Sequence, residues 1–188
     1  MKNIEGYISL IRNSNTRRAA SAFLTYLAVS AVSTVAAYLY FLVLGSNLRY
    51  AIVESSTTAA DLMGSQMNNA IEALILFAAV FTVGYRWIAP ILCAWRGACL
   101  GCATYILRMD NLIGASAGYR WSLAAYFASI FAFLALSAVS LVYSDAICAS
   151  HTAGEKAEKR ALIIEYAKVF LILSGAIFIF GCLTVVLI

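Results

Sequence analysis

The chain has 188 residues, of which 63% are apolar and 12% charged, and its formal net charge is +4. Soluble domains carry roughly 45–50% apolar and about 25% charged residues, so this chain has too few polar side chains to cover a water-exposed surface. The mean hydropathy of +0.88 also excludes a disordered chain. The composition therefore predicts an all-α, polytopic integral membrane protein that binds no nucleic acid.

Five apolar stretches are candidate transmembrane helices, in chain order 20–44, 70–85, 88–107, 121–143 and 167–188. About 20 mainly apolar residues cross a hydrocarbon layer of ~30 Å as a helix. These stretches are apolar on all sides, whereas barrel strands alternate apolar and polar residues. We predict a single transmembrane domain over 1–188 with about five helices, and place residues 1–19 in the cytoplasm.

Lys and Arg outside the spans or within a turn of a span end predict the orientation, because short cytoplasmic loops are enriched in basic residues. With the N-terminus inside, the cytoplasmic basic residues are Lys2, Arg12, Arg17, Arg18, Arg86, Lys156, Lys159, Arg160 and Lys168. Only Arg49, Arg108 and Arg120 then lie outside. We expect a plasma-membrane protein with a cytoplasmic N-terminus, a solvated outer loop at 46–69 and a cytoplasmic loop at 144–166. A short helix around 59–63 is an option within the outer loop.

The loop 144–166 carries charges of alternating sign near its centre. Glu155 and Lys159 stand four residues apart, in the order that supports a helix. We therefore expect this loop to extend the last span as a helix. Docking of a partner on the same helix is the alternative use.

The second and third spans are separated by a break between Gly84 and Pro90. Proline removes a backbone donor and disfavours helix at the preceding residue. We expect a tight helix–break–helix element here. The alternative is one long helix kinked at Pro90, which would leave 97–107 as a half-span.

Arg96 is the one charge deep within a predicted span. An arginine near the bilayer centre costs about 2.5–3.5 kcal/mol on insertion scales and normally faces protein or a water-filled cavity. Either Arg96 is buried with a structural or gating role, or the helix starts later and Arg96 reaches the inner headgroups. Glu72 is predicted near the outer end of its span, so a direct Arg96–Glu72 pair is not expected.

Small residues mark faces where helices can approach closely. Gly97 and Gly101 form a GxxxG pattern, which is common in helix contacts within membranes. The fourth span carries a stripe of alanines along one face, namely Ala125, Ala128, Ala132 and Ala135. In the fifth span, Gly175 and Gly181 are candidates for close helix contacts. The five cysteines lie in or beside spans, and the one CxxC pair, Cys99 and Cys102, lies within a span without a second pair or nearby histidines, so we expect free thiols and no metal or cofactor.

Residues 69–107 resemble the stage II sporulation protein M family. The matching features are an asparagine-led span from Asn69 to Gly84, the break at Pro90, and the basic residue followed by GxxxG at Arg96 to Gly101. The resemblance implies a polytopic scaffold at the sporulation septum of an endospore-forming bacterium. There it would hold a peptidoglycan-degrading complex that includes a lytic transglycosylase and an amidase.

The sequence favours a non-enzymatic membrane scaffold that recruits other membrane proteins, with peptidoglycan hydrolases as the partners implied by the resemblance. The alternative is a transporter or permease subunit with a broken-helix path near Pro90 and Arg96, as found in carriers. An intramembrane enzyme would need a nucleophile–base or metal arrangement, which the sequence does not offer. The candidate structural or functional residues are Gly84, Pro90, Arg96, Gly97 and Gly101.

Overall fold

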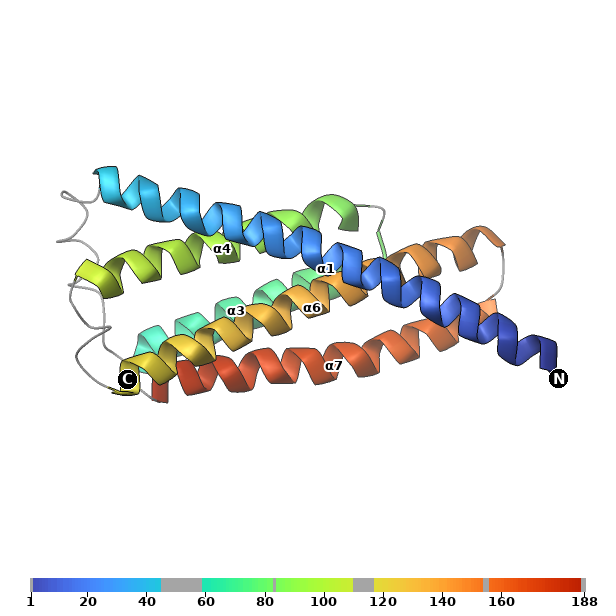
Figure 1. Ribbon diagram of the computed structural model, residues 1–188. Coiled ribbons are helices and arrows are strands. Elements are labelled where there is room, and N and C mark those ends of the chain that lie inside the picture. Colours follow the sequence, from blue (N-terminus) through green and yellow to red (C-terminus); the bar gives the residue numbers. More distant parts are fainter. Residues whose placement is uncertain (1, 45–58, 83, 110–116, 154–155, 187–188) are drawn as a thin grey trace.

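The computed structural model describes residues 2–44, 59–82, 84–109, 117–153 and 156–186. Within these ranges the chain forms five helices: α1 (Lys2–Leu44), α3 (Ala59–Ala79), α4 (Tyr85–Met109), α6 (Ala117–Ala153) and α7 (Lys156–Val186). Successive helices run in opposite directions, so that the two chain ends lie at opposite ends of an elongated bundle (Figure 1). The prediction of an all-α, polytopic helical membrane protein is confirmed.

Four of the described helices are long and apolar enough to cross a membrane, over Asn15–Val43, Tyr85–Tyr105, Ala124–Ala149 and Lys159–Thr184. The predicted second span differs from the others. Its apolar helix covers only Met67–Ala79, which is about 20 Å at 1.5 Å per residue. The helix α3 begins at Ala59, so the prediction of a loop is wrong over 59–69, and the rest of the predicted outer loop, 46–58, lies outside the described residues.

The fourth helix, α6, is the centre of the bundle. Half of the residues in the most apolar stretch of α6 are buried inside the bundle. In the corresponding stretches of α1 and α7 only 11% are buried. The largest side chains in the interior come from four helices, among them Phe133 and Leu134 of α6, Tyr85 of α4, Tyr166 of α7 and Leu76 of α3. Along this centre α1 packs chiefly on α4, and α7 on α6.

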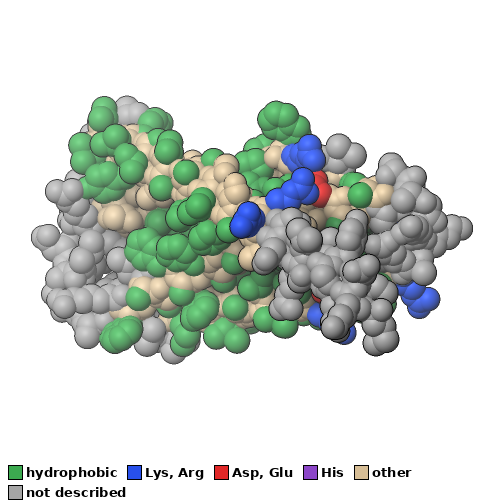
Figure 2. Space-filling view, turned by 45° about the vertical axis from the view of Figure 1, so that its right-hand side comes forward, with side chains coloured by type: hydrophobic (Ala, Val, Ile, Leu, Met, Phe, Trp, Pro, Cys, Tyr) green, Lys and Arg blue, Asp and Glu red, His purple; other side chains and the backbone are tan. Residues whose placement is uncertain are grey.

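The outward faces are apolar, as lipid requires. Large side chains such as Val32, Ile91 and Ile172 are each more than 60% exposed, and hydrophobic side chains cover much of the described surface (Figure 2). Lys and Arg side chains gather toward the end that carries the N-terminus (Figure 2). Because apolar side chains face outward without partners, the surrounding medium is a lipid bilayer.

Helices α6 and α7, like α1, extend beyond the start of α4 (Figure 1). Arg86, at the start of α4, forms an ion pair of 3.0 Å with Asp145 of α6, and α6 continues from there to Ala153. Helix α7 then begins at Lys156. The loop predicted at 144–166 is therefore largely helical, and the expected helical extension of the last span is confirmed.

The N-terminal segment is also helical from Lys2, continuous with the first span.

The alanine stripe of α6 lies partly inside the bundle, with Ala125 buried and Ala132 packed against the hydrophobic core. Of the two candidate glycines in α7, Gly181 is buried. A Cβ placed on Gly175 would meet no atom within 4 Å, so no close helix contact among the described residues explains that glycine.

Candidate functional site

The most unusual feature of the interior is a cluster of three polar side chains from α3 and α4. The Nε of Arg96 donates to Oε2 of Glu72 at 2.5 Å, and its Nη2 donates to Oδ1 of Asn69 at 2.7 Å. The exposed fraction of the side chain is 6% for Arg96 and 13% for Glu72. The guanidinium and the carboxylate therefore neutralise each other inside the bundle.

A third helix closes the cluster from another side. The Cζ of Arg96 lies 4.1 Å from the centre of the Phe133 ring, and Phe133 of α6 is completely buried. A guanidinium over an aromatic face gains a cation–π attraction that grows when water is excluded. Arg96 thus links α3, α4 and α6 through an ion pair, a hydrogen bond and a ring contact.

The antiparallel arrangement of α3 and α4 explains why these residues meet. In two antiparallel helices, residues that are equally far in sequence from the connection lie side by side. Asn69 on α3 and Arg96 on α4 are at nearly equal distances from the connection at 80–84. Asn69 and Glu72 are three residues apart, so they project from one face of α3. One arginine side chain can then reach both.

The expectation that Arg96 and Glu72 do not pair is wrong. It placed Glu72 near the outer end of a span beginning at residue 70, whereas α3 begins at Ala59 and holds Glu72 well within the helix. The alternative in which Arg96 reaches the inner headgroups is also wrong. Arg96 lies midway along the apolar stretch Tyr85–Tyr105, and its side chain is buried.

Two predicted glycines hold α4 against α1. A Cβ on Gly97 would overlap the backbone carbonyl of Ser30, and one on Gly101 would overlap that of Thr34. Only hydrogen fits at these positions, so the GxxxG pattern does form a close helix contact. Because Gly97 follows Arg96 directly, this contact also fixes the position of the arginine on α4.

The other two predicted residues lie near the break. Gly84 accepts hydrogen bonds from the backbone N–H groups of Trp87 and Ile88 and so begins α4. Pro90 lies within α4, so the prediction that the break extends to Pro90 is wrong, and so is the alternative of one long kinked helix. Proline is tolerated here because it removes only the bond to the Arg86 carbonyl, near an exposed end of the helix.

The interior also holds hydroxyl groups that the sequence analysis missed. Tyr85 donates from its hydroxyl to the Ser137 carbonyl at 2.7 Å, and the hydroxyls of Ser140 and Tyr166 lie 3.0 Å apart. Ser137 and Ser140 are fully buried on α6. Such bonds join helices where no hydrophobic effect drives association. The serines repeat on one face of α6, which is the signal that could have revealed them.

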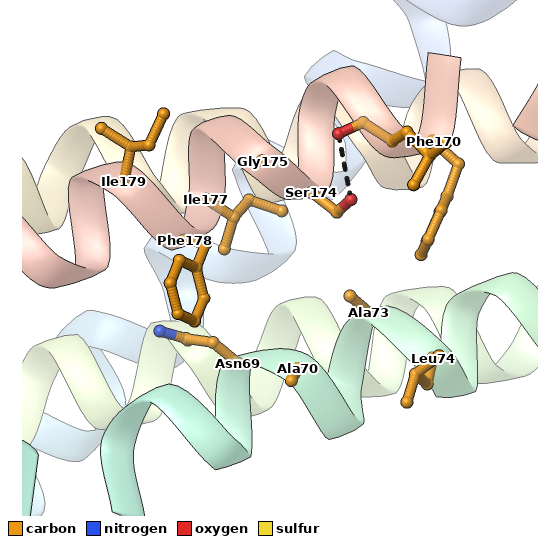
Figure 3. Close-up of a pocket in the computed structure, with 11 residues that line it drawn as sticks. Asn69, Ala70, Ala73, Leu74, Phe170, Ser174, Gly175, Ile177, Phe178 and Ile179 are labelled. Carbon is orange, nitrogen blue, oxygen red and sulfur yellow. Dashed lines mark hydrogen bonds between the residues drawn. The ribbon is translucent and has the colours of Figure 1, made fainter. Parts of the chain in front are cut away.

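A cavity of about 510 Å³ lies between α3 and α7 and reaches the charged cluster at Asn69. Figure 3 shows Asn69, Ala70 and Ala73 on α3 facing Phe178 and Ile177 on α7. Its walls are otherwise largely apolar, and the Ser174 hydroxyl donates to the carbonyl of Leu171 at 3.3 Å. The cavity suits a largely apolar occupant.

The structure offers no further reactive arrangement within the described ranges. The five cysteines, all of them described, form no disulfide, and Cys93 is buried. Among the described residues, no group of three or more His, Cys, Asp or Glu side chains could hold a metal ion.

The fold and the site define the chain as a multi-pass helical membrane protein with a charge pair buried among its helices. In comparisons with known proteins, no family model, no curated protein and no solved structure matches the chain.

Proposed function

We propose that the chain is a non-enzymatic membrane scaffold whose buried charges are engaged by its own helices and not by a solute. The observation that carries this proposal is the closure of the Arg96 site. Glu72 balances the charge of the guanidinium, Asn69 accepts one of its hydrogen bonds, and Phe133 covers its face. A charge engaged in this way holds helices together, whereas a charge that serves a solute needs an open side.

The proposed location is the plasma membrane, with the N-terminus in the cytoplasm. The support comes from basic residues that share one end of the bundle, where α1 enters its apolar stretch and where α4 and α7 begin: Arg17, Arg18, Arg86, Lys159 and Arg160. A biotin-acceptor tag before residue 2 tests this orientation. We expect modification by a cytoplasmic ligase and none by an enzyme added outside intact cells; labelling from outside would reject the orientation.

The proposed partners are other membrane proteins, and the resemblance of residues 69–107 to the stage II sporulation protein M family makes peptidoglycan hydrolases the specific candidates. The experiment is affinity purification of the tagged full chain from membranes of sporulating cells, followed by an assay for peptidoglycan degradation. We expect activity to co-purify with the tagged chain and not with an untagged control. A tagged chain that brings down no degrading activity would reject this partner class.

A transporter or permease subunit is the second candidate, and the cavity at Asn69 favours it. The variant Arg96→Leu/Glu72→Leu separates the two functions, because it removes both charges without leaving either unpaired. A scaffold keeps its co-purifying partners in this variant. A carrier that uses Arg96 loses uptake of labelled acetate or inorganic phosphate into proteoliposomes. Uptake by the wild-type chain that the double variant abolishes would reject the scaffold.

A further inference from the structure

A second cavity, of about 440 Å³, lies between α1, α4 and α6, away from the Arg96 cluster. The side chains that line this cavity are charged at one end and apolar farther along the helices. Arg18, Arg86 and Asp145 supply charges, and the adjoining wall includes Pro90 and Leu141. We call this cavity the interfacial groove.

The charges of the interfacial groove sum to +1, from two arginines and one aspartate. The Asp145 carboxylate accepts from Nη2 of Arg86, while 70% of the Arg86 side chain stays exposed. Arg18 is also exposed and forms no ion pair with any residue that the structure describes. Hydroxyl groups of Ser21 and Tyr26 line the same groove. The groove therefore presents donors and net positive charge, a combination that suits an anion.

The position of the interfacial groove along the bundle is that of a membrane surface. Arg18 and Arg86 stand near the beginnings of the apolar stretches Asn15–Val43 and Tyr85–Tyr105. Trp87, next to Arg86, is 75% exposed, and tryptophan is enriched at the level of lipid headgroups. The basic end of the groove thus lies at the headgroups, and its apolar wall faces the acyl chains.

We propose that the interfacial groove binds an anionic phospholipid. The phosphate lies between Arg18 and Arg86, and one acyl chain follows the apolar wall past Pro90 and Leu141. Charge complementarity and the change from polar to apolar lining select this occupant, because a basic pocket between membrane helices recognises anionic headgroups. Free phosphate would leave the apolar wall uncovered, and a zwitterionic lipid would gain less from the net charge.

The test measures lipid binding to the purified full chain in detergent micelles by native mass spectrometry. The probes are phosphatidylglycerol and phosphatidylcholine with identical acyl chains, together with inorganic phosphate. We expect phosphatidylglycerol to bind at least fivefold more tightly than phosphatidylcholine, and phosphate alone not to compete. Equal binding of the two lipids, or competition by millimolar phosphate, would overturn the proposal.

Single substitutions locate the site. Arg18→Gln and Arg86→Gln each lower the affinity for phosphatidylglycerol about fivefold, the factor expected for one basic residue near an anionic lipid surface. Arg17→Gln is the matched control, because Arg17 is an exposed neighbour on α1 that does not line the groove. An equal loss in Arg17→Gln would overturn the proposal, since binding would then follow total charge alone.

The variant Asp145→Asn separates lipid binding from a structural role of the ion pair. Removing the carboxylate raises the charge of the groove from +1 to +2, so we expect tighter binding of phosphatidylglycerol. If the Arg86–Asp145 pair only shaped the groove, the same variant would weaken binding. Thermal unfolding of each variant in the same detergent shows whether the fold is retained.

Discussion

Removal of the Glu72 carboxylate is the perturbation that most sharply tests the role of the buried pair. In Glu72→Leu the guanidinium of Arg96 loses the acceptor at 2.5 Å, while 94% of its side chain remains shielded. Breaking a buried pair in this way costs about 3–5 kcal/mol, because an uncompensated charge stays in the interior. Replacing both partners by leucine is often neutral, since neither charge then has to be buried.

We therefore expect Glu72→Leu to lower the free energy of unfolding by about 3 kcal/mol or more, and Glu72→Leu/Arg96→Leu to recover most of that loss. The assay is reversible unfolding of the purified chain in mixed micelles of a mild detergent and dodecyl sulfate, followed by tryptophan fluorescence. A loss below about 1 kcal/mol in the single variant, as is typical of exposed pairs, would refute the reasoning. So would additive losses in the double variant.

Two further predictions concern the helix contacts. Gly97→Ala places a methyl group against the α1 backbone and should destabilise the chain by about 1–3 kcal/mol. The control Gly175→Ala, with open space around the glycine, should be neutral or stabilising by up to about 1 kcal/mol. Equal effects of the two variants in the unfolding assay would contradict the close contact of Gly97 with α1. Tyr85→Phe removes the hydrogen bond to the Ser137 carbonyl and should cost about 1 kcal/mol. The exposed Tyr40→Phe is its control, and equal midpoints for the two variants would count against that bond.

The sequence predicted those parts of the fold that depend on local composition. Long apolar runs identified the membrane class and the four long helices, because a lipid environment leaves little other choice. Gly97 and Gly101 pointed to a close contact, although the pattern alone could not name α1 as the partner. The alternating charges of this segment predicted the helical extension, which the structure describes from Lys156 onward, whereas Glu155, one partner of the predicted pair with Lys159, lies outside the described residues.

The parts that failed depend on how helices are placed against each other. The Arg96–Glu72 pair was missed because it requires the start of α3 and its register against α4, and polarity alone assigned the start of α3 to a loop. The break was placed too far along the chain because a proline was given more weight than the hydrogen bonds available around Gly84. The buried serines of α6 were missed because serine within an apolar run gives only a weak signal.

The state of the Glu72 carboxyl group gives the most direct measurement of the central claim, that Arg96 and Glu72 neutralise each other inside the bundle. An apolar carbodiimide enters the membrane and modifies protonated carboxyl groups, which peptide mass spectrometry detects. Glu72 should stay unmodified in the wild-type chain, because its carboxylate is paired. In Arg96→Leu it should be modified, since the carboxyl group of Glu72 then lacks the cation that engages it in the wild-type chain. Equal modification of Glu72 in both chains would contradict the account.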